Sequence, residues 1–305
     1  MSDFTSNFWN LYIAILTIAG IIFCIWLLVA VGKREQKSSD SSHVWDGDLT
    51  ELNNQLPGWW RWMFWGLLIF SIGYLVYFPG LGSFKGTGDW TQIKQFDEEM
   101  TALQAKTKPT YDSYLAMAAE DLSKNKNAME TAGRIFSNEC ARCHGSDAGG
   151  GAGFPSLKSG DAMSWGGDVA AIKQSITEGR TGVMTPMGEA VGGAPGVKAV
   201  VAYMRSLSGL SHDEGLMAQG GKLFEDNCAA CHGADGKGVK EMGAPNLTDN
   251  IWVYGGSEAA MTKVVELGKN SNLAQGDFAM PAYKGVLSQA QIHLLTAYVW
   301  GKSHK

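Results

Sequence analysis

The segments CARCHG at residues 140–145 and CAACHG at residues 228–233 repeat one six-residue frame in a chain of 305 residues. Each contains Cys-x-x-Cys-His, the spacing typical of covalent haem c attachment. The two thiols bind the haem edge, and the adjacent histidine is placed to ligate the iron. The sequence therefore predicts two haem c groups, with attachment and axial-ligand residues Cys140, Cys143, His144, Cys228, Cys231 and His232.

Other interpretations of these cysteines fit less well. The chain has five cysteines, and four of them form the two local pairs, which leaves little for a disulfide framework. A zinc site does not require a histidine directly after each second cysteine. A redox pair of the thioredoxin type would follow a strand and would not need a second copy. The fifth cysteine, Cys24, lies in an apolar run, where we expect an inert packing role.

A haem that carries electrons needs a second axial ligand, and methionine opposite histidine raises its potential. The segment GDFAMPAYKG, residues 276–285, offers Met280 followed by a stiffening proline. The segment GRTGVMTPMG, residues 179–188, offers Met184 and Met187. The spacing to the following glycine favours Met184, with Met187 in the position of the aromatic residue and as the alternative ligand. Within-repeat ligation is the default expectation, and ligation across repeats stays open.

The repeat extends beyond the haem frames. A glycine and a phenylalanine precede the first cysteine of each frame by seven and four residues, on an expected helix whose glycine suits close contact with another helix. Each repeat ends in a second helix that carries Tyr203 or Tyr298, and we expect these tyrosines to pack against the first helix. A proline follows each frame, Pro155 or Pro245, and its carbonyl is expected to accept the imidazole N–H. This pattern resembles class I cytochromes c in tandem.

The first part of the chain is expected to anchor it in a membrane. No charged residue lies between Phe4 and Gly32, and the apolar run Leu11–Val31 is long enough to cross a bilayer. A second apolar run, Trp62–Phe78, is extended by Trp59 and Trp60 at its edge. No positive charge precedes the first run and no small-residue cleavage site follows it, so both segments are expected to be retained.

The charges between these two runs predict the orientation. Lys33, Arg34 and Lys37 follow the first run, whereas the N-terminus offers only Asp3 as a charged side chain. The positive-inside rule places residues 32–58 in the cytoplasm and both termini on the opposite side. In bacteria haem c is attached on that opposite side, which is the periplasm. The chain is therefore expected to be a multi-pass protein of the bacterial inner membrane.

The expected fold class is all-α: two N-terminal transmembrane helices followed by two tandem class I cytochrome c domains. The expected anchor covers 1–85, with helices at about 8–31 and 59–79, and a helical linker covers 86–127. The first cytochrome c domain is expected at 128–209 and the second at 210–305. The linker has apolar residues at helical spacing, which suits a solvated helix or a helix that docks against partner subunits.

Charge and motifs exclude several function classes. The net charge is −5, which does not suit a nucleic-acid-binding protein. With both irons closed by histidine and methionine, no coordination site is left for a substrate. The chain is therefore expected to carry electrons and to have no catalytic centre of its own. The alternatives are a dihaem carrier for another respiratory complex, a peroxidase-like dihaem enzyme with one displaceable ligand, and a haem-based sensor.

The segment HVWDGDLTELNNQLPGWWRWMFW, residues 43–65, together with the two apolar runs and the two haem frames, closely resembles the CcoP/FixP family of dihaem subunits of cbb3-type cytochrome c oxidases. The match is carried by Asp46-Gly47, Glu51–Asn54 and Leu56–Trp60. The family usually has a proline directly after the ligand methionine, whereas this chain has Thr185 after Met184. The chain also has two apolar helices, where many relatives have one. The resemblance implies electron transfer from soluble cytochrome c, through a monohaem c subunit, to the haem–copper subunit that reduces oxygen and pumps protons.

Overall fold

This computed structural model describes residues 6–32, 44–45, 47, 49–50, 57–270 and 279–304, and the chain divides into two compact units, Met1–Lys106 and Thr107–Lys305. The regular secondary structure of the described residues is helical except for two antiparallel strands of two residues each, β1 (Val44–Trp45) and β2 (Leu49–Thr50). The expected helical fold is thus confirmed. Most of the expected cytoplasmic segment 32–58 lies outside the described residues.

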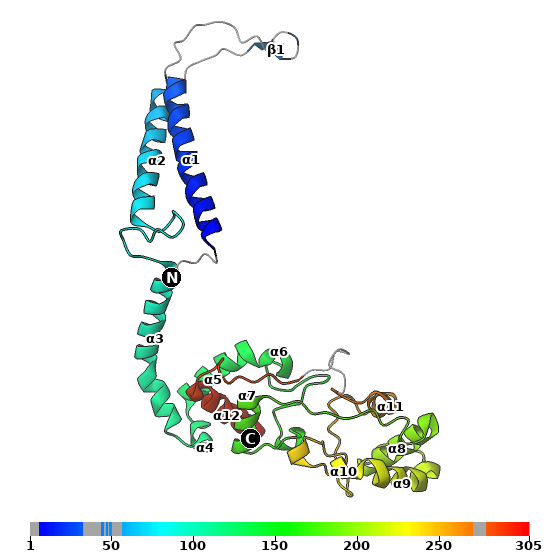
Figure 1. Cartoon of the computed structure of the whole chain (residues 1–305). Helices are drawn as coiled ribbons and strands as arrows, with labels where there is room; N and C mark the ends of the chain where they lie inside the picture. Colours follow the sequence, from blue (N-terminus) through cyan, green and yellow to red (C-terminus); the bar gives the residue numbers. More distant parts are fainter. Residues whose placement is uncertain are drawn as a thin grey trace. The chain divides into compact units, whose positions relative to one another are not determined.

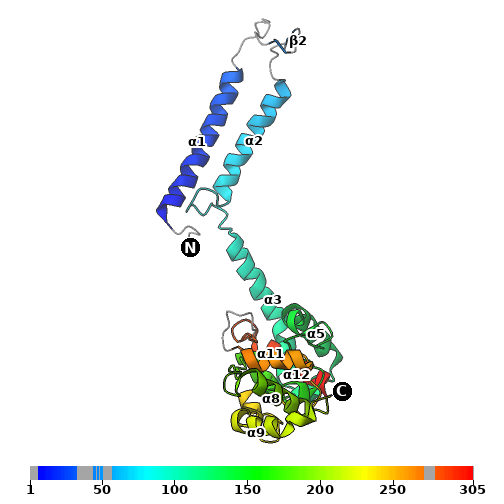
Figure 2. The same ribbon diagram turned by 90° about the vertical axis from the view of Figure 1, so that its right-hand side faces the viewer.

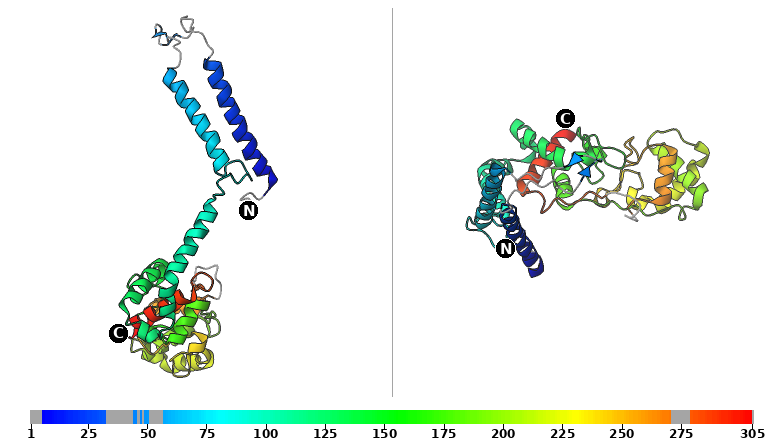
Figure 3. Two further views of the ribbon diagram at one scale, coloured as in Figure 1. Left: turned by 90° about the vertical axis from the view of Figure 1, so that its left-hand side faces the viewer. Right: turned by 90° about the horizontal axis from the view of Figure 1, so that it is seen from above.

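The first unit contains an antiparallel pair of helices, α1 (Asn7–Gly32) and α2 (Gly58–Tyr77), which lie side by side in Figure 3. Neither helix has a buried residue, so their apolar side chains face outward. Among the described residues, α1 is the helix whose length and apolar composition suit a membrane span. The first turns of α2 carry Arg61 among tryptophans, so composition does not confirm it as a second span. Cys24 is exposed on α1 and does not pack within this chain, contrary to expectation.

A polar contact fixes one end of this helix pair. The Asn10 side chain in the first turn of α1 accepts a hydrogen bond from the Ser83 backbone N–H at 2.6 Å and donates to Ser83 Oγ at 2.8 Å. The chain reaches Ser83 through Gly82, which has a φ of +60°. A Cβ at Gly82 would collide with the Asn10 side chain and backbone. Glycine at this position therefore lets the loop after α2 close against α1.

The remaining helices follow in chain order. They are α3 (Gln92–Leu115), α4 (Ala119–Leu122), α5 (Lys126–Glu139), α6 (Ala141–His144), α7 (Val169–Glu178), α8 (Gly193–Leu207), α9 (Met217–Asn227), α10 (Ala229–His232), α11 (Glu258–Leu267) and α12 (Gln289–Ser303), with short 3₁₀ turns at Gly160–Ala162, Glu214–Leu216 and Lys240–Met242. Side-chain caps start four of the longer ones: Asn125, Asp168, Ser257 and Ser288 each accept a backbone N–H of the first turn.

The linker helix α3 is amphipathic, as the sequence predicted. Tyr114 near its end and Leu122 in α4 are buried in a cluster with Leu294 and Ala297 of α12. Towards its start, Ile93 and Phe96 are exposed. The linker therefore joins the second unit through its C-terminal end, and docking of its exposed apolar face against partner subunits stays a prediction.

The second unit exchanges helices between the two sequence repeats. The last helix of the first repeat, α8, packs against α9 and α11 of the second repeat, and α12 packs against α5 and α7 of the first. Figures 1 and 2 show this pairing: red α12 lies against green α5, whereas α8 and α9 lie side by side near orange α11. The boundary expected at residues 209 and 210 therefore separates the repeats in sequence but not the packed units.

The two tyrosines show the exchange at the level of side chains. The Tyr298 ring lies 5.2 Å from that of Phe136, and the Tyr203 ring lies 5.3 Å from that of Phe224. Each tyrosine thus packs against the first helix of the other repeat and not against that of its own. The physical reason is local: α8 and α9 are joined by residues 208–216, and helices joined by a short connection usually pack side by side.

The crossing of α8 and α9 depends on Gly220, the neighbour of the Gly221 that the sequence analysis singled out. Gly220 of α9 is buried against α8, and a Cβ at this position would lie 2.2 Å from the Ala199 carbonyl oxygen. That oxygen belongs to the helix backbone and cannot move away. The neighbouring Gly221 lies under the Tyr203 ring.

We expect Gly220→Ala to lower the free energy of unfolding by about 1–3 kcal/mol, because overpacking outweighs the better helix propensity of alanine. Thermal unfolding of the haem-loaded chain checks this. The matched control is Gly182→Ala, because a Cβ at Gly182 meets nothing within 4 Å. Equal unfolding temperatures for the two variants would contradict the expected close contact.

Candidate haem sites

Each Cys-x-x-Cys-His frame forms a single helical turn at the end of a longer helix. Cys140 ends α5 and precedes α6, and Cys228 holds the same place between α9 and α10. In both frames the backbone N–H of the histidine donates to the backbone carbonyl of the first cysteine at 3.0 Å. All of these thiols are free. The turn therefore brings two thiols and one imidazole together over a distance that one haem edge can span.

The thiols are not arranged as a reactive pair. Burial raises the pKa of Cys140 to about 11, and burial likewise raises the pKa of Cys228 to about 11. A catalytic or redox cysteine needs a lowered pKa, because the thiolate is the nucleophile. These environments suit sulfur held as a thioether better than a thiol–disulfide couple.

The proline carbonyls orient both histidines, as the sequence predicted. His144 Nδ1 lies 3.0 Å from the Pro155 carbonyl oxygen, and His232 Nδ1 lies 3.2 Å from that of Pro245. A carbonyl only accepts, so Nδ1 carries the proton and donates it, and Nε2 is left with its lone pair. Burial lowers the pKa of each histidine, which keeps the ring neutral. A neutral imidazole with Nε2 available is the form that binds iron.

The first frame borders an apolar cluster built from both repeats. The residues around it come from α5, α7 and α12: Phe136, Ile172, Ile176, Ile292, Leu295 and Val299 are buried together. Cys140 packs against this cluster, and so does Met280 from the second repeat. Met280 is thus placed on the site of the first frame.

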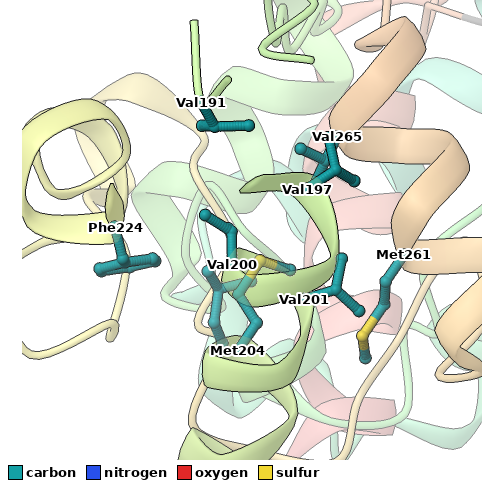
Figure 4. Packing of buried hydrophobic residues seen from close by; sticks show 9 residues of the cluster. Val191, Val197, Val200, Val201, Met204, Phe224, Met261 and Val265 are labelled. Atoms are coloured by element: carbon teal, nitrogen blue, oxygen red, sulfur yellow. The ribbon is translucent and has the colours of Figure 1, made fainter. Parts of the chain in front are cut away.

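The second frame has the corresponding arrangement. Its cluster contains residues of α8, α9 and α11, among them Val197, Val200, Val201, Met204, Phe224, Met261 and Val265, which Figure 4 shows gathered around one interior. Cys228 packs against it, together with Met184 and Met187 of the first repeat. Both candidate methionines of the first repeat are therefore placed on the site of the second frame.

Backbone pairing gives Met184 and Met280 equivalent places. Met280 exchanges two backbone hydrogen bonds with Arg180, at 2.9 and 3.0 Å, and Met184 exchanges two with Lys269, at 2.9 and 2.8 Å. A glycine precedes Arg180 and another precedes Lys269, and the φ of each glycine is close to +70°. A Cβ there would collide with the methionine carbonyl, at 2.4 Å for Gly179 and 2.3 Å for Gly268. Glycine thus allows the two methionine segments to cross.

Met187 corresponds to a different residue of the other segment. Its backbone N–H donates to the Val265 carbonyl at 2.9 Å, as that of Tyr283 donates to Ile176 at 3.1 Å. The Met187 sulfur accepts a hydrogen bond from Thr185 Oγ1 at 3.4 Å. Met187 therefore corresponds to the aromatic Tyr283, and Met184 corresponds to Met280. This correspondence favours Met184 as the candidate ligand.

These residues fit a haem c at each frame. Each frame brings two thiols and an oriented imidazole together, and a methionine packs against the same apolar cluster as the first cysteine, which is the donor set that such a group requires. The sequence found every one of these side chains but not the exchange between the repeats. The short connection between α8 and α9 was the signal that could have revealed the exchange. It favours packing of α8 against α9 over packing of α8 against α5 of its own repeat.

Sequence comparisons divide the chain in the same way. Residues 37–85 match the N-terminal domain of cytochrome oxidase-cbb3, FixP. Residues 127–204 match cytochrome c oxidase, cbb3-type, subunit III, and residues 217–303 match cytochrome c. The chain is 44% identical to the cbb3-type cytochrome c oxidase subunit CcoP of Rubrivivax gelatinosus over 305 residues, covering 99% of this chain and 97% of the relative.

The chain belongs to the CcoP/FixP family. Two further members are FixP of Azorhizobium caulinodans, 36% identical over 86% of this chain and 92% of the relative, and CcoP of Rhodobacter capsulatus, 34% identical over 85% and 93%. The resemblance based on residues 43–65 is thereby confirmed. As a CcoP/FixP protein with two tandem cytochrome c domains, the chain is a haem c protein of electron transport, with one haem for each domain.

Proposed function

We propose that this chain is the dihaem electron-transfer subunit of a cbb3-type oxidase. It takes electrons from a soluble cytochrome c and passes them, through a monohaem c subunit, to the haem–copper subunit that reduces oxygen and pumps protons. The names of the CcoP and FixP relatives support the oxidase as the complex. The geometry of this chain supports the carrier role.

The observation that carries the proposal is the crossed placement of the methionines. Met280 packs against the apolar cluster that also contacts Cys140 of the first frame, and Met184 packs against the one that also contacts Cys228 of the second. We assign Cys140, Cys143, Cys228 and Cys231 as the residues that would hold two haems c by thioether bonds, and His144 with Met280 and His232 with Met184 as the side chains that would ligate the irons. No coordination position would then remain for a substrate, so the chain would have no catalytic centre of its own.

Groups of the chain itself hold the proposed ligands in place. A bound haem c supplies reversible one-electron chemistry. The proline carbonyls hold each imidazole in one orientation, and the paired backbones of Arg180 and Lys269 hold the methionine segments. Buried apolar side chains flank both frames. Ligands that are held in place change little between redox states, which favours fast electron transfer.

The membrane arrangement is part of the proposal. We assign α1 and α2 as two spans of the bacterial inner membrane, with residues 32–58 in the cytoplasm and both termini in the periplasm. The apolar composition of α1 and the outward-facing aromatic side chains of α2 support this assignment. The cations Lys33, Arg34 and Lys37 support the orientation. The haem domains are then on the side where haem c is attached and where soluble cytochrome c is found.

The test is a reduced-minus-oxidised haem spectrum of the tagged chain, gently extracted from the membranes of its own host. We expect haem b together with two or more covalent haems c, and oxygen uptake with reduced cytochrome c as donor. Haem c alone, under conditions that keep complexes intact, would instead identify a carrier with a different partner. Peroxide-dependent turnover by the isolated chain would indicate a displaceable ligand and overturn the closed-site assignment.

A further inference from the structure

One hydroxyl group connects the Met280 segment to the first haem frame. Tyr283, three residues after Met280, is partly buried and donates its phenolic O–H to the Glu139 backbone carbonyl at 2.8 Å. Glu139 is the last residue of α5 and directly precedes Cys140. The bond therefore ties a segment of the second repeat to the residue next to the first thiol of the first repeat.

The shape of the frame leaves the Glu139 carbonyl available for this bond. The last four carbonyls of an α-helix have no partner within the helix. The Cys143 backbone N–H, which would reach Glu139 in a continued helix, donates instead to the Cys140 carbonyl at 3.1 Å. A carbonyl left in this way requires a donor from elsewhere, and the Tyr283 hydroxyl supplies it.

Among the described residues, no hydroxyl makes the corresponding bond at the second frame. Its methionine segment has Met187 in the place of Tyr283, and a thioether sulfur only accepts hydrogen bonds. The nearest hydroxyl of that segment belongs to Thr185, which donates to the Met187 sulfur at 3.4 Å and so stays within the segment. The two sites, alike in fold, therefore differ by one side-chain bond between the methionine segment and the frame.

We propose that Tyr283 is a positioning residue for the first haem, whose hydroxyl resists displacement of Met280 from the iron. This inference rests on the proposed function, because it requires Met280 as an axial ligand of a haem held at Cys140 and Cys143. A different sixth ligand can replace the Met280 sulfur only if the methionine segment moves outward. That movement breaks the bond between Tyr283 and Glu139, and a bond present in only one of two states shifts the equilibrium towards that state.

The test measures how readily imidazole replaces methionine in the full chain in detergent. The background is His232→Ala/Met184→Ala, which removes both proposed ligands of the second iron, so the methionine-to-iron absorption reports the first haem alone. Tyr283→Phe keeps the ring and removes the hydroxyl. Tyr298→Phe is the matched control, because Tyr298 packs against the same apolar cluster and its hydroxyl makes no hydrogen bond among the described residues.

We expect Tyr283→Phe to tighten imidazole binding to the first haem about two- to tenfold, which is the effect of one net hydrogen bond on a binding equilibrium. Tyr298→Phe should leave the affinity unchanged. In the chain that keeps all its ligands, Tyr283→Phe should shift one phase of the imidazole titration and leave the other in place. This second measurement does not depend on the folding of the background variant.

Unchanged imidazole affinity in Tyr283→Phe would overturn the proposal, because Met280 would then leave the iron without breaking the bond to Glu139. An equal gain in Tyr298→Phe would also overturn it, because it would indicate general loosening of the apolar cluster. A folded background variant that has no methionine-to-iron absorption would instead contradict the crossed ligands of the proposed function, which keeps the two failures distinct.

Discussion

The double variant His144→Ala/Met280→Ala should keep one intact His–Met haem per chain, whereas His144→Ala/Met184→Ala should keep none. The first variant removes both proposed ligands of one iron and leaves the second site untouched. The second variant removes one ligand from each iron. Ligation within repeats predicts the opposite pair of results, so the two variants separate the arrangements without any need to know which haem is which.

The measurement is the intensity of the methionine-to-iron absorption in the oxidised protein, divided by the total covalent haem. His144→Ala alone serves as the control for folding and should keep one intact haem. Loss of methionine raises access of water to the iron and lowers its potential, so the affected haem should also turn high-spin. An intact haem in His144→Ala/Met184→Ala would show that our crossed assignment is wrong.

Residues 107–209 alone should fail to give a stable haem protein, although they contain a complete Cys-x-x-Cys-His frame and all of the first sequence repeat. This fragment lacks α12, which buries Ile292, Leu294, Leu295, Ala297 and Val299 against the first site and its linker. Burying one large aliphatic side chain stabilises a fold by about 1.5–3 kcal/mol, and whole domains are stable by about 5–15 kcal/mol. The lost contacts therefore exceed what the fragment can spare.

The matched control is residues 107–305, which retain the whole second unit and should carry two His–Met haems. Covalent haem content and cooperative thermal unfolding of the two proteins provide the comparison. A fragment 107–209 with a low-spin His–Met spectrum would mean that the first repeat folds by itself and that α8 can take the place of α12.

Much of the site followed from the sequence because its chemistry is local. Cys140, Cys143 and His144 lie within one helical turn, so their spacing by itself places them around one haem edge. The same holds for the proline that receives the imidazole N–H, since Pro155 and Pro245 follow their frames after a short loop. The choice of Met184 over Met187 also came from spacing, and the backbone pairing agrees with it.

Other features depended on contacts that no local pattern contains. The two repeats present the same glycine and phenylalanine on the first helix and the same tyrosine on the second, so either tyrosine helix suits either partner.

The sequence by itself thus predicted the cofactor, its attachment residues, the candidate ligands and the apolar first helix, since each depends on residue types at short spacing. Only the tertiary structure decided against which frame's apolar cluster each methionine packs. The short connection between α8 and α9 packs these two helices side by side, and α12 then packs against α5. Chain connectivity, and not the similarity of the repeats, therefore placed Met280 on the first site and Met184 on the second.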